Sequence, residues 1–385
     1  MTKITFFHDK SSCLYPLGAA HTEGKMLLGA LTLAEYWDMV VRSSINNIEQ
    51  GVSQNVLTSL QRGQLNDRWL PTADAVKTLK DLPVGADLYF NGTPLFRWNA
   101  SIEQLEPQFA TNAELLSTPT QLFSNAGEWI TEQVQAVAKK WAAKPASQIP
   151  LPSHVQVIGP VDSLLIAPGA RANACNINTS AGPVLLGPDS EIQEGSSIRG
   201  PLYLGAKSVI KMGSKVYGPT SIGDQCRIGG EVSNSVFLGF ANKGHDGFVG
   251  NSVIGHWCNL GAATNTSNLK SNYSTVRLWD KDTGKYDESG LQFCGLIMGD
   301  HSKSGINTMF NTGSIVGPGC NVFGSGFQPK HIPPFSWGGG ADWQKHEFDK
   351  FIQTARSVMS RRGHELLDNE IELWKKEYLR DTKIT

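Results

Sequence analysis

A strict six-residue repeat is the feature of this sequence that most limits how the chain can fold. The first block places an apolar residue at every sixth position, at Leu186, Ile192, Ile198, Leu204, Ile210, Val216, Ile222 and Ile228. The second block keeps the same step at Met298, Ser304, Phe310, Val316 and Val322. An α-helix repeats at about 3.6 residues and a strand at two. A period of six instead predicts a parallel β-helix, in which each hexapeptide supplies one short strand and one corner.

The repeat also sets the expected domain boundaries. We predict an α/β domain over 1–145, a proline-rich linker over 146–153, the β-helix over 154–340 and a C-terminal helical cap over 341–385. Within the first domain, 4–7 and 86–92 have the pattern of strands, and 31–41 and 126–144 that of helices. The polar segment 271–290 breaks the period, so we expect a surface loop there. The cap would cover the unpaired edge at the end of the β-helix.

Charge and cysteine content exclude several classes of function. The chain has 34 basic and 35 acidic residues, and this balance favours neither a nucleic-acid nor a membrane partner. No signal peptide or long apolar span is evident, so we expect a soluble cytoplasmic protein. The six cysteines lie apart without a CxxC pair, and we expect reduced thiols, including Cys258 and Cys294.

The stretch 234–270 is the candidate site because the strict period fails there. Lys243, Gly244, His245, Asp246 and Gly247 place small and polar residues where an inward apolar residue is expected. Irregularity inside a consistent repeat is where function is expected. A histidine titrates near neutral pH, so His245 is a candidate general base.

This stretch resembles the acetyltransferase half of the bifunctional N-acetylglucosamine-1-phosphate uridyltransferase/glucosamine-1-phosphate acetyltransferase family. The matching positions are Gly244-His245, Phe248-Val249-Gly250, Ile254-Gly255, Asn259-Leu260-Gly261-Ala262-Ala263-Thr264, Asn268 and the block 298–310. The whole chain is similar to the divergent group of this family found in Bacteroidetes. That likeness rests on 14–17, 29–37, 197–204, 242–255, 291–313 and 335–340.

The resemblance implies a left-handed β-helix, a homotrimer with sites between subunits, and acetyl-CoA as co-substrate. His245 would be the base that takes a proton from the acceptor amine. The substrate contacts it implies, or that replace family residues, are Lys215, Lys243, Phe248, Asn259, Asn268 and Lys270. The coenzyme would lie along the repeats at Gly299, Gly305, Asn307, Thr308 and Gly317.

The sequence departs from the family pattern at the phosphate contacts. Phe248 replaces a tyrosine, the family's two phosphate lysines fall on Gly295 and near Asn234, and its arginine falls near Lys215. Phosphate groups usually bind Arg or Lys. The departures therefore favour an acceptor other than glucosamine-1-phosphate, unless Lys243 or Lys270 replaces the lost cations.

The N-terminal half lacks the glycine-rich loop that binds nucleotide phosphates in sugar nucleotidyltransferases. His8, Asp9, Lys10 and Lys25 are the residues there that could still bind a ligand. We expect a nucleotidyltransferase relative that has lost catalysis, with Mg²⁺ required only if that domain is active.

Simpler interpretations compete with the catalytic ones. His245, His256 and His301 could form a metal site, but their spacing lacks the expected pair, so we predict no metal. Lys243, Lys270 and Lys303 could be solvated surface charges. Residues 337–340 could be a flexible exit from the β-helix rather than a coenzyme contact.

The sequence thus predicts an acyl-CoA-dependent N-acyltransferase acting on an amino-sugar phosphate or a nucleotide-linked amino sugar. The alternatives are a sugar-1-phosphate nucleotidyltransferase and a non-catalytic protein that binds a sugar nucleotide. The acceptor's amine would attack the thioester without a covalent enzyme intermediate, which requires a base but no nucleophile.

Overall fold

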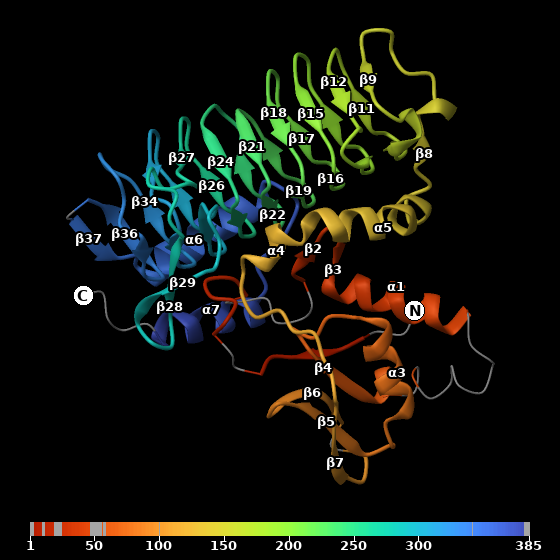
Figure 1. The fold of residues 1–385 in the computed structure, drawn as a ribbon. Coiled ribbons are helices and arrows are strands. Elements are labelled where there is room, and N and C mark those ends of the chain that lie inside the picture. Colours follow the sequence, from red (N-terminus) through yellow and green to blue (C-terminus); the bar gives the residue numbers. More distant parts are fainter. Residues whose placement is uncertain are drawn as a thin grey trace.

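A long parallel β-helix lies beside a smaller α/β region in this protein (Figure 1). The structure is a computed structural model, and it describes residues 4–9, 12–18, 25–46, 56, 59–99, 101–340 and 342–380. The expected parallel β-helix, N-terminal α/β region and C-terminal helices are confirmed.

Three sheets form the sides of the β-helix, and the chain visits them in a fixed order. The first sheet consists of β8 (Lys144–Pro145), β10 (Leu164–Ile166), β13 (Val184–Leu186), β16 (Leu202–Leu204), β19 (Thr220–Ile222), β22 (Val236–Phe237), β25 (Val253–Ile254), β30 (Leu296–Met298), β33 (Ser314–Val316) and β35 (His331–Ile332). The second sheet consists of β11 (Arg171–Ala172), β14 (Glu191–Ile192), β17 (Val209–Ile210), β20 (Arg227–Ile228), β23 (Asn242–Lys243), β26 (Asn259–Leu260), β31 (Lys303–Ser304), β34 (Asn321–Val322), β36 (Ser336–Gly339) and β37 (Asp342–Lys345). The third sheet consists of β9 (Gln156–Ile158), β12 (Asn176–Asn178), β15 (Ser197–Arg199), β18 (Lys215–Tyr217), β21 (Glu231–Ser233) and β24 (Phe248–Gly250), and the pair β27 (Asn265–Thr266) and β32 (Met309–Phe310) follows it.

The apolar residues of the six-residue repeat form the interior of the β-helix. Leu186 pairs with Leu204, and Leu204 pairs with Ile222, so a regular turn of the β-helix takes eighteen residues, from 186 to 204 to 222. Every residue of the first block is 3 % exposed or less. Stacked in register, these side chains form one continuous apolar cluster along the axis. Each buried aliphatic side chain stabilises the fold by about 1.5–3 kcal/mol.

The first sheet is apolar on both sides because a second core covers its outer face. Its outward positions include Leu185, Tyr203, Val236 and Ile297, which belong to the same cluster as the core of the N-terminal half. The ring of Tyr203 stacks on Trp141 with 5.7 Å between centroids. This arrangement explains why strands such as β13 and β16 are continuous apolar runs and do not alternate.

The N-terminal half contains a five-stranded sheet in the order β1-β4-β6-β5-β7, with helices beside it. Its strands are β1 (Phe6–Phe7), β4 (Gly63–Asn66), β5 (Ala86–Phe90), β6 (Thr93–Trp98) and β7 (Leu105–Phe109), and β2 (Leu27–Leu28) and β3 (Leu31–Thr32) form a separate hairpin. Its helices are α1 (Leu33–Asn46), α3 (Ala73–Asp81), α4 (Gln121–Ser124) and α5 (Ala126–Lys140).

Local signals explain where several of these elements begin and end. Thr32 and Glu35 form a capping box before α1: the Thr32 N–H donates to Glu35 Oε2 at 2.9 Å, and the Glu35 N–H donates to Thr32 Oγ1 at 3.4 Å. The predicted strand over 86–92 is β5, and Asn91 and Gly92 take φ values of 48° and 79° in the turn to β6. The predicted helix over 126–144 is α5, which ends at Lys140.

The segment expected as a linker contributes to the β-helix. Strand β8 pairs antiparallel with β10, and a 3₁₀ turn, η1 (Ala146–Gln148), follows it. Ala146 packs in the interior cluster of the β-helix. A second 3₁₀ turn, η2 (Val161–Ser163), leads into β10.

The C-terminal helices lie along one corner of the β-helix, whereas we expected them to cover its end. Helix α6 (Phe348–Ser360) and helix α7 (Asp368–Arg380) share a core with Trp257 and Phe335, which stand at the corner between the first and second sheets. Arg362 donates at 2.8 Å to the Gln225 carbonyl and to Asn242 Oδ1, which lie in turns of the β-helix before Trp257. The hairpin of β36 and β37 closes the end instead, with Trp343 against the interior cluster.

The insertion expected as a surface loop is a β-hairpin packed on the first sheet. Strands β28 (Arg277–Asp280) and β29 (Lys285–Glu288) pair antiparallel, and Trp279 stacks on His331 with 4.4 Å between centroids. Lys281 lies 3.6 Å from Glu377 of α7. The hairpin therefore joins the first sheet to the C-terminal helices. None of the helices in the described part of the chain is both long and apolar enough to cross a membrane.

The inward and outward residues of one strand should differ sharply in their contribution to stability. Ile210 of β17 is fully buried in the interior, whereas its neighbour Val209 is half-buried on the outer side. We expect Ile210→Ala to lower the free energy of unfolding by about 2–5 kcal/mol and Val209→Ala to lower it by roughly 1 kcal/mol or less. Equal losses in denaturant titrations would contradict the proposed interior stacking.

Candidate active site

From residue 191 onward, the edge between the second and third sheets is regular except at one place. Its regular corners have four residues, as in 193–196, 211–214, 261–264 and 305–308. In each of these the third residue takes a positive φ; these residues are Gly195, Gly213, Ala263 and Asn307. Stacking of equal corners produces a straight edge.

Two successive corners break this rule. Ile228 pairs with Lys243 and Glu231 pairs with Phe248, so the corner at 229–230 has two residues while the next, at 244–247, has four. In the longer corner the positive φ of 114° falls on the fourth residue, Gly247, and not on the third. The short corner is recessed, and the following corner projects beyond it.

The recess is a cavity of about 400 Å³, which we call the notch. It is lined by Lys211, Met212, Gly229, Gly230, Gly244, His245, Asp246, Ala262 and Ala263. Glycines without side chains form its floor, so a ligand can approach the backbone closely there. His245 and Asp246 are exposed in the projecting corner and form one wall.

His245, the candidate base, lies in the wall of this cavity. An exposed imidazole beside a cavity can accept a proton from a bound amine, provided that the acceptor lies within hydrogen-bond distance. Asp246 adds a carboxylate to the same wall.

Lys243 does not lie in the notch, contrary to the prediction that it contacts substrate. Its side chain is 1 % exposed and occupies the interior column between Ile228 and Leu260. Nζ donates to the Gly229 carbonyl at 2.7 Å and to the His245 carbonyl at 2.6 Å. Burial lowers the pKa of this ammonium to about 8, while the nearby charge of Asp246 acts in the opposite direction.

Two predicted substrate residues come together on the third sheet. A Cβ at Gly250 would lie 2.5 Å from the Phe248 ring and 2.7 Å from Asn268 Nδ2, so both side chains cover this glycine. Asn268 Nδ2 donates to Asn251 Oδ1 at 2.8 Å.

The other three predicted substrate residues, Lys215, Asn259 and Lys270, lie apart from the notch. Asn259 is on the outer side of the second sheet, in a hollow with Arg361 and Arg362. Lys215 lies on the third sheet, 3.9 Å from Glu231. Lys270 donates to the Thr275 carbonyl at the base of the insertion.

The residues expected to bind the coenzyme divide between two edges. Gly305, Asn307 and Thr308 lie in a corner between the second and third sheets, on the same edge of the β-helix as the notch. The Asn307 N–H donates to the Ala262 carbonyl at 2.8 Å. Gly299 and Gly317 lie at the corner of the first and second sheets. A Cβ on Gly299 would lie 2.7 Å from the Pro16 carbonyl oxygen, and one on Gly317 would lie 2.4 Å from Pro334 N.

The structure separates the three histidines considered as a metal site. The His301 N–H donates to the His256 carbonyl at 2.8 Å, so both are at the corner of the first and second sheets, whereas His245 lies on the other edge of the second sheet.

Burial raises the pKa of the Cys258 thiol, and it raises the pKa of Cys294 to about 12. Both values agree with unreactive thiols.

A group of possible metal ligands does occur in the N-terminal half. His8 Nδ1 lies 3.0 Å from Asp67 Oδ2, and the Arg68 guanidinium pairs with Asp9. Ligand atoms of His8, Asp9 and Asp67 lie within 4.8 Å of one another, and among the described residues no other such group is found. They follow the parallel strands β1 and β4, at whose carboxyl ends open α/β sheets bind ligands. Lys10, the remaining sequence candidate nearby, lies outside the described residues.

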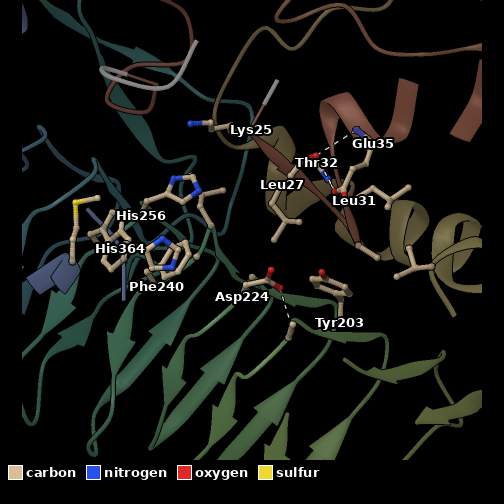
Figure 2. A pocket seen from close by; sticks show the side chains of 18 of the residues that line it. Lys25, Leu27, Leu31, Thr32, Glu35, Tyr203, Asp224, Phe240, His256 and His364 are labelled. Carbon is tan, nitrogen blue, oxygen red and sulfur yellow. Dashed lines mark hydrogen bonds between the residues drawn. The ribbon is translucent and has the colours of Figure 1, made fainter. Parts of the chain in front are cut away.

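A second cavity, of about 460 Å³, lies where the N-terminal half, the β-helix and the C-terminal helices meet (Figure 2). Its charged lining comprises Glu35, Asp224, Glu365, Glu370, Lys25 and Lys140. Burial raises the pKa of Asp224, although the Ala206 N–H donates to its Oδ1 at 2.8 Å and opposes the shift. Four carboxyl groups against two lysines disfavour a phosphate-bearing ligand in this cavity.

Sequence reasoning missed Lys211, Met212 and the glycine floor of the notch. Lys211 lies before the interruption, in a stretch whose period is unbroken. It reaches the notch because the next corner is two residues shorter. The paired strands show the shortening: Ile210 to Ile228 is eighteen residues, but Ile228 to Lys243 is fifteen, and two of the three missing residues are lost at this corner.

The insertion 271–290 lies away from the notch. It contacts the first sheet and α7, and in a three-sided β-helix that sheet faces away from the corner that carries His245.

The fold places this chain among the parallel β-helices built from hexapeptide repeats. The chain is 38 % identical over 90 residues to the bifunctional protein GlmU of Methanocaldococcus jannaschii, covering 23 % of this chain and 21 % of that protein. It is 35 % identical over 144 residues to a bifunctional sugar-1-phosphate nucleotidylyltransferase/acetyltransferase of Sulfurisphaera tokodaii, covering 37 % and 35 %. The chain thus spans about a fifth to a third of the length of these curated relatives. No protein-family model matches it.

Two solved acyltransferase structures align with about half of this chain at low TM-scores. The polysialic-acid-specific acetyltransferase NeuO has a TM-score of 0.27 and 13 % identity, covering 50 % of this chain and 87 % of that one. Arabidopsis UDP-N-acetylglucosamine acyltransferase has a TM-score of 0.21 and 13 % identity, covering 55 % and 79 %.

The buried ammonium of Lys243 should make stability depend on pH. Its pKa falls from the ordinary value of 10.5 to about 8 on folding, so between these pH values the unfolded chain binds more protons. Stability should therefore rise with pH across this window, on the order of 3 kcal/mol in total. We expect denaturant titrations from pH 7.5 to 10.5 to show this gain for the wild type relative to Lys243→Met. Parallel pH profiles for the two proteins would contradict burial of the ammonium.

Proposed function

We propose that the protein is an acyl-CoA-dependent acyltransferase that acts on a sugar. The observation that carries the proposal is the notch, a cavity with a backbone floor and the exposed His245 in its wall. The sequence likeness to GlmU-type proteins supports the same class of reaction.

In its more specific form, the reaction is N-acetylation of an amino-sugar phosphate or a nucleotide-linked amino sugar. His245 accepts a proton from the acceptor's amine, and the amine nitrogen attacks the thioester carbonyl of acetyl-CoA. The new C–N bond replaces the C–S bond, and the coenzyme leaves as the thiol. A neutral imidazole suits this step.

The lining of the notch indicates how the two substrates would lie. Lys211 is its one lysine and would bind the acceptor's phosphate group. The coenzyme would extend along the same edge past Ala262 to Gly305 and Asn307, where Ile306 is 72 % exposed. Gly299 and Gly317 would stabilise the fold instead, because neighbouring backbone already packs against them.

We also propose a homotrimer with the notch at subunit boundaries. The third sheet and its edge leave Met212, Tyr217 and Phe327 at least 41 % exposed, whereas the outer face of the first sheet is covered within the chain. Association would bury these exposed apolar side chains. Sedimentation at several concentrations would test the trimer.

Nucleotidyl transfer in the N-terminal half is the second candidate function. The group of His8, Asp9 and Asp67 favours it, because these residues could bind Mg²⁺ at the edge of the sheet. The pairing of Arg68 with Asp9 opposes it by partly neutralising the site. Magnesium-dependent release of pyrophosphate from a sugar-1-phosphate and a nucleoside triphosphate would establish this activity.

Removal of the imidazole should abolish most of the acyl transfer. We expect His245→Ala to lower kcat by about 100-fold or more, with little change in the affinity for coenzyme A. Release of free thiol from acetyl-CoA with a panel of amino sugars measures the rate, and His154→Ala, an exposed histidine outside the notch, is the control. A wild-type rate in His245→Ala would exclude His245 as the base. Binding of a sugar nucleotide without any turnover by the wild type would favour a non-catalytic binding protein.

Removal of the notch lysine should weaken binding of a phosphate-bearing acceptor. We expect Lys211→Met to raise KM for that acceptor by about tenfold or more and to leave KM for acetyl-CoA nearly unchanged. Lys207→Met, at the other corner of the same turn, is the matched control. Equal effects of both substitutions would show that general charge, and not a contact in the notch, is responsible.

A further inference from the structure

The interior column of the second sheet contains one cation. From strand to strand its inward residues are Ile192, Ile210, Ile228, Lys243, Leu260, Ser304 and Val322. Ammonium groups are rarely buried without specific partners, because their desolvation is costly. The presence of Lys243 in this column therefore requires an explanation.

Regular corners show which interaction the lysine replaces. Each regular corner ends in a residue with a hydroxyl group. That hydroxyl donates to the backbone carbonyl of the first residue, either of the same corner or of the next corner along the edge. Ser214 Oγ and Ser196 Oγ donate to the Lys211 carbonyl at 2.6 and 2.9 Å. Thr308 Oγ1 donates to the Gly305 carbonyl at 2.9 Å, and Thr264 Oγ1 also does so at 3.4 Å.

The two irregular corners have no such hydroxyl. The short corner is Gly229-Gly230, and the projecting corner ends in Gly247, where a Cβ would lie 2.2 Å from the Thr264 carbonyl oxygen. A serine or threonine therefore does not fit at 247. Lys243 Nζ instead reaches the carbonyl of Gly229, the residue that corresponds to Lys211 and Gly305.

The same ammonium also donates to the carbonyl of His245. An ammonium has three donor hydrogens and no acceptor, so one group can join both corners from the inside. Through these bonds the lysine links the floor of the notch to the wall that carries the imidazole.

We propose that Lys243 is a positioning residue, which replaces the missing corner hydroxyls and fixes the projecting turn 244–247 so that His245 faces the notch. The catalytic part of this inference rests on the proposed function, whereas the structural part is independent of it. Lys243 has no direct contact with substrate in this account.

The test compares Lys243→Met with Leu260→Met, which changes an inward residue of the next strand in the same column. Methionine suits the apolar interior, so both variants should fold. Amide hydrogen exchange followed by mass spectrometry should be about tenfold or more faster over 244–248 in Lys243→Met, with no change over 209–216. Leu260→Met should exchange like the wild type over 244–248. Unchanged exchange over 244–248 in Lys243→Met would overturn the proposal.

Kinetics then test the catalytic consequence. We expect Lys243→Met to lower kcat by about tenfold to 100-fold with KM for both substrates within about threefold. Lys243→Gln, which retains an N–H donor, should recover part of both the rate and the exchange protection. Faster exchange with a wild-type kcat would overturn the positioning role. If His245→Ala keeps the wild-type rate, His245 is not the base, and hydrogen exchange alone decides whether Lys243 fixes the turn.

Discussion

The register of stacked turns is the constraint on which this structure depends. Each inward residue lies above its counterpart in the preceding turn, so a change in one corner must be absorbed at that edge without disturbing the interior column. The corner at 229–230 is two residues shorter than its regular neighbours, yet Lys243 remains paired with Ile228. The difference appears at the surface as the notch, and inside as the one charged residue of the column. The candidate site and the unusual interior residue thus have one common cause.

The second organising feature is the shared core on the first sheet. Because its outward residues pack against the N-terminal half, this sheet is not free for ligands or partners, and the insertion and α7 extend the cover. The third sheet and its edge remain open, and His245 lies at this edge.

Much of the fold could be predicted from the sequence because a period of six has one structural solution. The location of His245 followed from the break in that period. Lys243 could not be placed, because its outward or inward direction depends on the length of the preceding corner, which the family resemblance does not give. Gly299 and Gly317 were assigned to the coenzyme from their repeat positions, but the segments around Pro16 and Pro334 pack against them. The C-terminal helices showed an amphipathic pattern, which indicates burial but not the surface that buries them.

The most direct measurement is a crystal structure of the protein with a non-reactive acetyl-CoA analogue and an amino-sugar phosphate. The account predicts that the acceptor's nitrogen lies in the notch within hydrogen-bond distance of the His245 ring, with its phosphate near Lys211 and the coenzyme along the edge past Ala262. An acceptor bound in the cavity beside Asp224, or one whose amine lies far from His245, would contradict it.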